Sequence, residues 1–185
     1  MFNKVLSKTT SEMEKSIENL KHEFSTVRTG RASLSLIQDI KVEYYGTQVP
    51  LNQVGNISIP DARLIEIKPW EQKMVKEIER AILKSDLGIT PNNDGKVVRL
   101  PIPPLTEERR KELAKITKKM AEDHKVTIRN IRRESNEDLK RMEKKKEISE
   151  DELRKGEDKV QELTNRFIKK VDELYIHKEK EIMEV

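Results

Sequence analysis

The feature that most constrains the fold is a long segment, residues 106–146, that contains neither glycine nor proline. Apolar residues recur along it at steps of three and four, which is the spacing of one face of an α-helix. These residues are Leu113, Ile116, Met120, Ile128, Ile131, Leu139 and Met142. The sequence therefore predicts one amphipathic helix, about 60 Å long at 1.5 Å per residue, that buries a single stripe.

The same segment carries a surplus of positive charge. Leu105–Lys146 holds 15 Lys and Arg against 9 Asp and Glu, a surplus of six, whereas the net charge of the whole chain is +4. At about 100° per residue, several basic residues fall on the face opposite the apolar stripe. They are Lys111, Lys118, Lys125, Arg129 and Arg132. Such a helix is typical of a bundle member that offers its outer face to phosphate groups.

Two further amphipathic helices are expected at the ends of the chain. The first covers about residues 3–29, with an apolar heptad seam and with Gly30 placed as a C-cap. The last begins at Ser149, where Ser149–Glu152 reads as a capping box, and Gly156 on its seam allows close helix approach. Three apolar seams bury one another best as an antiparallel three-helix bundle.

The middle of the chain has a different character, because residues 30–104 contain all seven prolines and five of the six glycines. Local patterns predict strands at 40–44, 49–51, 56–59, 64–67 and 96–100 and a helix at 71–84, with Tyr44, Trp70 and Leu83 in the core. The expected fold class is α+β: residues 1–30 and 105–185 form an elongated three-helix bundle, and residues 31–104 form an inserted β/α/β domain. If the two chain crossings between these parts lie side by side, they form a hinge.

The sequence lacks the residue constellations that an enzyme needs. None of His22, His124 and His177 has a second histidine at metal-ligand spacing, and His124 is expected to be a hydrogen-bonded residue at the edge of the core. No glycine-rich phosphate loop is present, and there is no cysteine for a disulfide or a thiolate metal site. No apolar run approaches the ~20 residues of a membrane span, and no signal peptide is evident. We therefore expect a cytoplasmic protein that is not an enzyme, has no cofactor or metal, and does not bind membranes.

The basic face admits two interpretations. For an arbitrary basic helix, a solvated face without a partner is the commoner one. Arg129, Arg132 and Arg133 favour phosphate binding, because a guanidinium can donate two parallel hydrogen bonds to phosphate oxygens. Few aromatic residues are available for base stacking, so structured nucleic acid held by its backbone is the expected partner. A helical holdase or scaffold of the prefoldin kind is a second hypothesis, and a nucleic-acid-modifying enzyme a third.

Taken in order, six segments resemble the ribosome recycling factor family over essentially the whole chain. They are Arg28–Ser33, Val42–Gly46, Ala81–Gly88, Pro103–Arg110, Ile128–Arg133 and Leu163–Ile168. The resemblance implies an L-shaped protein, expected to be a monomer, in which a hinged β/α/β domain joins the bundle. It also implies that, with elongation factor G and GTP, the protein binds large-subunit ribosomal RNA after termination and splits the ribosome.

The resemblance also assigns residues. Arg28, Arg129 and Arg132 match the RNA-contacting arginines of the family. This chain differs from the family at Leu34, where many relatives have proline, and the difference puts in question the stiffness of the first crossing between the two parts, near Gly30. The full set expected to bind ribosomal RNA is Arg28, Arg110, Lys118, Lys125, Arg129, Arg132 and Arg133. The expected hinge residues are Gly30, Arg31, Ala32, Ser33, Pro103, Pro104, Leu105 and Thr106.

Overall fold

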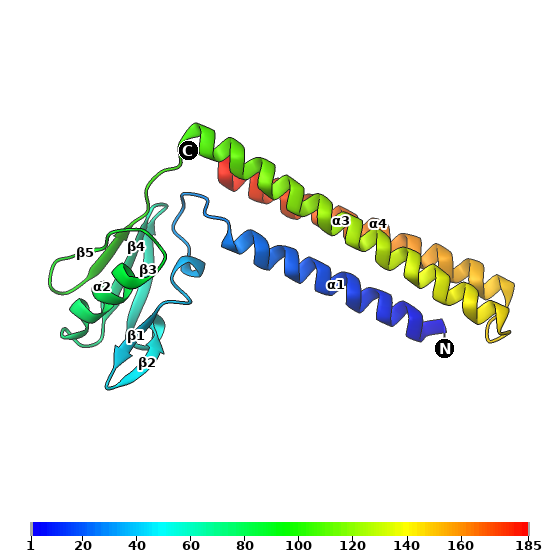
Figure 1. Cartoon of the computed structure of the whole chain (residues 1–185), viewed down its shortest axis with the longest axis horizontal. Helices are drawn as coiled ribbons and strands as arrows, with labels where there is room; N and C mark the ends of the chain where they lie inside the picture. The colour runs from blue at the N-terminus through cyan, green and yellow to red at the C-terminus, as the bar shows by residue number, and fades with distance from the viewer. Residues whose placement is uncertain (1, 185) are drawn as a thin grey trace. The chain divides into compact units, whose positions relative to one another are not determined.

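The structure is a computed structural model that describes residues 2–184, and these residues form two compact units (Figure 1). The first unit comprises the chain up to Val27 together with the chain from Arg110 onward. The second unit is Arg28–Arg109. Each unit encloses hydrophobic core clusters of its own, as a chain with two separate sets of apolar patterns requires.

Three long helices build the first unit: α1 (Phe2–Thr26), α3 (Glu107–Lys144) and α4 (Glu150–Met183). Helix α3 runs antiparallel to both neighbours, because its cross-helix partners follow the opposite order along the chain. The pairs are Thr9–Ser135 and Ser16–His124 toward α1, and Lys140–Glu157, Arg132–Gln161 and Lys125–Asp172 toward α4. The predicted antiparallel three-helix bundle is confirmed, and Figure 1 shows the three helices side by side.

The bundle core follows the predicted seams. Its main cluster consists of Met13, Ile17, Leu20, Phe24, Ala121, Ile128, Ile131, Phe167 and Val171. A second cluster, Leu139, Ile148 and Val160, closes the end near the α3–α4 turn. The expectation for Ile116 was wrong, because its side chain is exposed and Thr117 takes the buried position. The Thr117 hydroxyl donates to the carbonyl of Leu113 at 3.0 Å, so its burial leaves no unsatisfied polar group.

The helix ends also follow the sequence signals, with one exception. The Thr106 hydroxyl accepts the Arg109 N–H at 3.2 Å, and the Ser149–Glu152 capping box is formed in both directions. Helix α1 ends at Thr26 rather than Thr29. Gly30 is therefore not its cap; it lies in the connecting segment with φ +73°, a conformation that favours glycine.

Gly156 is a point of close approach between the helices of the bundle. A Cβ built there would lie 2.8 Å from Cε2 of Phe2 and 2.9 Å from Cδ1 of Leu139. Phe2 belongs to α1 and Leu139 to α3, so the missing side chain makes room for residues of both neighbours against α4. The predicted role of Gly156 is confirmed.

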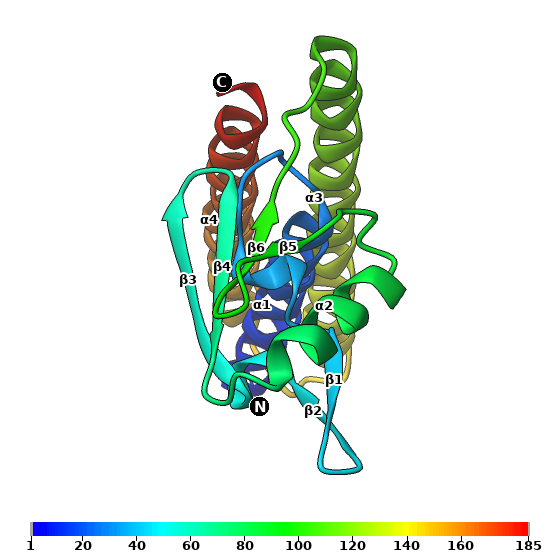
Figure 2. The ribbon, with the colours of Figure 1, turned by 90° about the vertical axis from the view of Figure 1, so that its left-hand side faces the viewer.

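The second unit contains two antiparallel sheets and one long helix. A hairpin forms from β1 (Lys41–Tyr44) and β2 (Thr47–Pro50), and the larger sheet has the order β3 (Gly55–Asp61), β4 (Leu64–Pro69), β6 (Val98–Pro101), β5 (Asn92–Asn93). Helix α2 (Met74–Lys84) packs against both β1 and the β5–β6 side of the larger sheet (Figure 2). Short 3-10 turns at Leu34–Leu36 and Leu51–Gln53 complete the unit.

Several side chains of this unit lie elsewhere than expected. Trp70 is 69% exposed and Leu83 is 57% exposed, so both core assignments were wrong. Tyr44 is half-buried and its hydroxyl donates to Glu71 at 2.7 Å, which ties β1 to the segment before α2. Helix α2 begins at Met74 instead of Glu71. The core residues are Ile37, Ile40, Val42, Leu51, Val54, Ile65, Ile67, Met74, Val75, Ile78, Ile82, Leu87, Val98, Leu100 and Ile102.

Gly156→Val is expected to lower the free energy of unfolding by about 1–3 kcal/mol, because the added methyl groups overpack the contact with Phe2 and Leu139. The measurement is urea denaturation followed by circular dichroism. The matched control is Asp158→Val, which places the same β-branched residue at an exposed position two residues along α4. Equal losses in the two variants would show that the loss does not come from packing at residue 156.

Candidate nucleic-acid interface

Several open positive charges of the bundle lie on α3. Lys118, Arg129 and Arg133 are exposed, and none of them forms an ion pair within the described part of the chain. Arg129 and Arg133 are four residues apart, so they are neighbours on the helix surface. Because Ile128 and Ile131 are buried, the helix turns these arginines toward solvent. Two adjacent guanidinium groups with open donors are suited to binding phosphate oxygens.

Arg132 lies at the edge of this surface and reaches toward α4. Its Nη1 donates to the side-chain oxygen of Gln161 at 3.2 Å, and the Gln161 amide nitrogen donates to Asn165 at 2.8 Å. The acceptor is a neutral amide, so the guanidinium keeps its full charge while one of its N–H groups is held. The sequence predicts Arg132 as a binding residue but does not show that Gln161 and Asn165 lie beside it, because the register between α3 and α4 depends on the tertiary structure.

Lys125 was expected on the open basic face, but the structure pairs it within the bundle. Its ammonium lies 2.5 Å from Asp172 and 3.0 Å from Glu122, and only 15% of its side chain is exposed. The hydrogen bond to Asp172 raises the pKa of Lys125, so the lysine stays charged and paired. The predicted basic stripe therefore contains both exposed cations, such as Lys118 and Arg129, and a lysine that is neutralised by α4.

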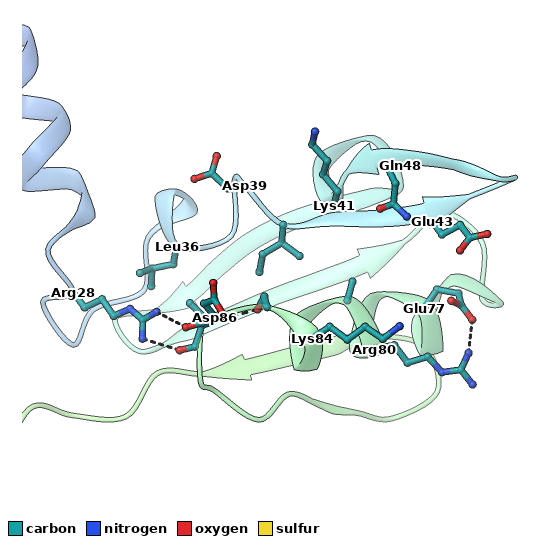
Figure 3. Close-up of a pocket in the computed structure, with 14 residues that line it drawn as sticks. Arg28, Leu36, Asp39, Lys41, Glu43, Gln48, Glu77, Arg80, Lys84 and Asp86 are labelled. Carbon is teal, nitrogen blue, oxygen red and sulfur yellow. Dashed lines mark hydrogen bonds and ion pairs between the residues drawn. The ribbon is translucent and has the colours of Figure 1, made fainter.

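The remaining two predicted RNA-binding residues differ from these. Arg110 is half-buried, and it is the residue at which the chain re-enters the first unit. Arg28 belongs to the second unit, where its guanidinium donates to the carbonyl oxygens of Leu87 at 2.7 Å and Asp86 at 3.0 Å (Figure 3). Arg28 thus holds the chain that leaves α2, and two of its five N–H donors are used there.

Arg28 lines a groove of about 670 Å³ between the β1 side of the second unit and α2 (Figure 3). Both signs of charge line this groove. The basic residues are Arg28, Lys41, Arg80 and Lys84, and the acidic residues are Asp39, Glu43, Glu77 and Asp86. A balanced lining gives no net attraction for a polyanion, so the groove does not extend the basic surface of α3.

The predicted hinge residues lie in two segments that touch within the second unit. A Cβ at Gly30 would be 3.1 Å from Cγ of Leu105. The amide of Ala32 donates to the carbonyl of Ala62 at 2.7 Å, and the amide of Ile102 donates to the carbonyl of Arg63 at 2.8 Å. Both connections are therefore anchored to the turn between β3 and β4. No pattern in the sequence predicts this anchoring.

A serine, a histidine and a glutamate meet between α1 and α3, but their setting does not suit catalysis. Ser16 Oγ lies 2.8 Å from His124 Nδ1, and His124 Nε2 lies 3.4 Å from Glu23. Ser16 is only 4% exposed, so a substrate has no access to its hydroxyl. The expectation that His124 is a hydrogen-bonded residue at the edge of the core is confirmed.

Within residues 2–184, no group of three or more His, Cys, Asp or Glu is arranged to hold a metal ion. Over the same residues, every helix is too short or too polar to cross a bilayer. The exposed guanidinium and ammonium groups of α3 are suited to binding anions.

Comparison with known proteins gives one consistent result. The family model described as "Ribosome recycling factor" matches residues 20–183. Relatives named ribosome-recycling factor from Trichlorobacter lovleyi and Bacillus licheniformis are 55% and 52% identical over 185 residues, which is the full length of each chain.

Two solved structures agree with this result. A solution structure of the ribosome recycling factor has a TM-score of 0.80 at 41% identity and covers all of this chain and 98% of that one. The T. thermophilus ribosome recycling factor, from models of it and of E. coli elongation factor G bound to the E. coli post-termination complex, has a TM-score of 0.67 at 44% identity over the whole of both chains. This chain belongs to the ribosome recycling factor family.

Proposed function

We propose that this chain, with elongation factor G and GTP, disassembles the post-termination ribosomal complex by binding large-subunit ribosomal RNA and splitting the subunits. Membership of the family supports the role, and the relative from T. thermophilus is described on a post-termination complex together with elongation factor G. The observation that carries the RNA contact is the set of open cations on α3: Lys118, Arg129 and Arg133, with Arg132 beside them.

Backbone recognition fits this surface better than base readout does. Arginine donors bind phosphate oxygens two at a time, whereas reading single-stranded bases requires aromatic platforms. Among the described residues of the first unit's helices, the large exposed hydrophobic side chains are Ile116, Val126, Ile176 and Met183, and none of them is aromatic. The proposed complex is therefore dominated by electrostatic contacts to structured RNA.

The seven predicted RNA-binding residues have unequal roles in this proposal. Arg129, Arg132 and Arg133 supply the main phosphate contacts, and Lys118 extends them along α3. Lys125 would contact RNA only by exchanging its ion pair with Asp172. Arg28 and Arg110 contribute positive charge from the segments that join the two units.

The proposal assigns the protein a mechanical role and no chemistry of its own. The energy for splitting comes from GTP hydrolysis by elongation factor G, and the protein works without a cofactor as a cytoplasmic monomer. The hinge is proposed at the two connections, on the bundle side of the anchored residues Ala32 and Ile102. Gly30, Arg31 and residues 103–106 lie there without helix or strand structure.

The test of the function is a sucrose gradient of post-termination ribosomes incubated with this protein, elongation factor G and GTP, with each component omitted in turn. Release of subunits only when all three are present is the expected result. Intact ribosomes in the complete reaction would contradict the proposal. Light scattering in the same buffer tests the holdase hypothesis, which requires oligomers and protection of unfolded client proteins.

Arg129→Ala is expected to weaken binding to isolated large subunits roughly 10-fold, the loss of about 1.4 kcal/mol from one charge-assisted contact. Cosedimentation at constant salt measures the change. The control is Arg154→Ala on α4, which removes another exposed arginine that is already paired with Glu150 at 2.7 Å. The variant at 129 should melt like the wild type, and binding equal to that of the control would remove Arg129 from the proposed site.

Binding to large subunits is also expected to weaken steeply with added salt, because phosphate contacts release counterions. In a plot of log affinity against log salt concentration, Arg129→Ala should reduce the slope by about one, as expected for one lost phosphate contact. A slope near zero for the wild-type protein would exclude the phosphate model even if binding itself is tight.

A further inference from the structure

The neutral side chain of Gln161 stands out in a row of otherwise acidic partners that α4 offers to α3. In the central part of the bundle, Lys140 faces Glu157 at 3.5 Å and Lys125 faces Asp172 at 2.5 Å. Arg132 lies between these two lysines along α3, and its partner on α4 is Gln161. The two lysines meet carboxylates, whereas the arginine meets an amide of the same length as glutamate.

The hydrogen-bond pattern settles which way this amide points. A guanidinium has only donors, so the Gln161 atom 3.2 Å from Arg132 must be the oxygen. The Gln161 nitrogen then faces the Asn165 side-chain oxygen at 2.8 Å, as a donor facing an acceptor. Asn165 is one helical turn beyond Gln161 on α4, so it holds the amide in this orientation.

We propose that Gln161, oriented by Asn165, is a positioning residue that holds the Arg132 guanidinium at the RNA-binding surface without neutralising it. This inference rests on the proposed function. A carboxylate in the same place would bind the guanidinium more strongly and compete with RNA phosphates for it. A residue without an acceptor would leave the arginine free to sample several rotamers, and that freedom would be lost on binding.

The comparison with Lys125 supports this division of roles. Both residues are half-buried, but Lys125 contacts two carboxylates whereas Arg132 has a neutral partner. Along one edge of α3, the charge of the partner on α4 thus separates a cation that holds the helices together from one that remains available to a polyanion.

Binding to isolated large subunits at several salt concentrations tests the inference. Gln161→Ala is expected to weaken binding about 2- to 5-fold, because Arg132 then loses rotamer freedom on binding, with no change in the salt slope. Gln161→Glu is expected to weaken it at least about 10-fold and to lower the salt slope by about one, because the introduced carboxylate occupies Arg132. A merely structural role for Gln161 would not lower the slope.

A double-mutant cycle shows whether Gln161 acts through Arg132. In the Arg132→Ala background, Gln161→Ala should cause no further loss. An equal loss in both backgrounds would overturn the inference. Asn165→Ala provides a second variant that adds no charge, and it should weaken binding in the same direction as Gln161→Ala. Thermal melts should match the wild type, because all three side chains lie at the surface.

The failure of this inference differs from the failure of the proposed function. If Arg132→Ala weakens binding but Gln161→Ala and Gln161→Glu bind like the wild type, Gln161 has no positioning role and the RNA contact stands. If Arg132→Ala itself binds like the wild type, the RNA contact proposed for this residue is wrong.

Discussion

The burial of one side of α3 against α1 and α4 is the constraint on which the rest of the structure depends. Leu113, Ile128 and Leu139 mark the buried stripe, and each is at most 5% exposed. Helix α3 is continuous over its 38 residues. The position of a cation around the helix axis, relative to the buried stripe, therefore decides whether the cation faces solvent or a neighbouring helix. Arg129 and Arg133 face solvent, whereas Lys125 and Arg132 lie at the edge and reach α4.

At that edge, the charge of the partner on α4 decides whether a basic residue of α3 pairs within the bundle or remains available to attract phosphates. Exposed ion pairs stabilise a fold by about 1 kcal/mol or less, so replacing one by a neutral hydrogen bond costs little stability. The effect on the field outside the protein is larger, because a paired carboxylate cancels the charge that would attract phosphates. Lys125 with Asp172 and Arg132 with Gln161 are examples of the two outcomes on one helix edge.

The second unit holds side by side the two connecting segments, near Gly30 and near Leu105, which are far apart in sequence. Ala32 and Ile102 both donate their amides to the turn between β3 and β4. Gly30 and Leu105 pack beyond them, and the approach is too close for a side chain at Gly30 to fit without a shift. The turn at Ala62–Arg63 therefore satisfies one backbone amide of each connection.

The sequence by itself determined the three helices, the caps at Thr106 and Ser149, the room made by Gly156 and the family, because these features depend on local periodicity and on short motifs. Only the tertiary structure decided that Trp70 and Leu83 are exposed, that Lys125 is paired and that Gln161 holds Arg132. The physical reason is register. Periodicity shows which side of a helix is apolar, but the residue that a side chain meets on the next helix depends on how far the two helices are shifted along each other.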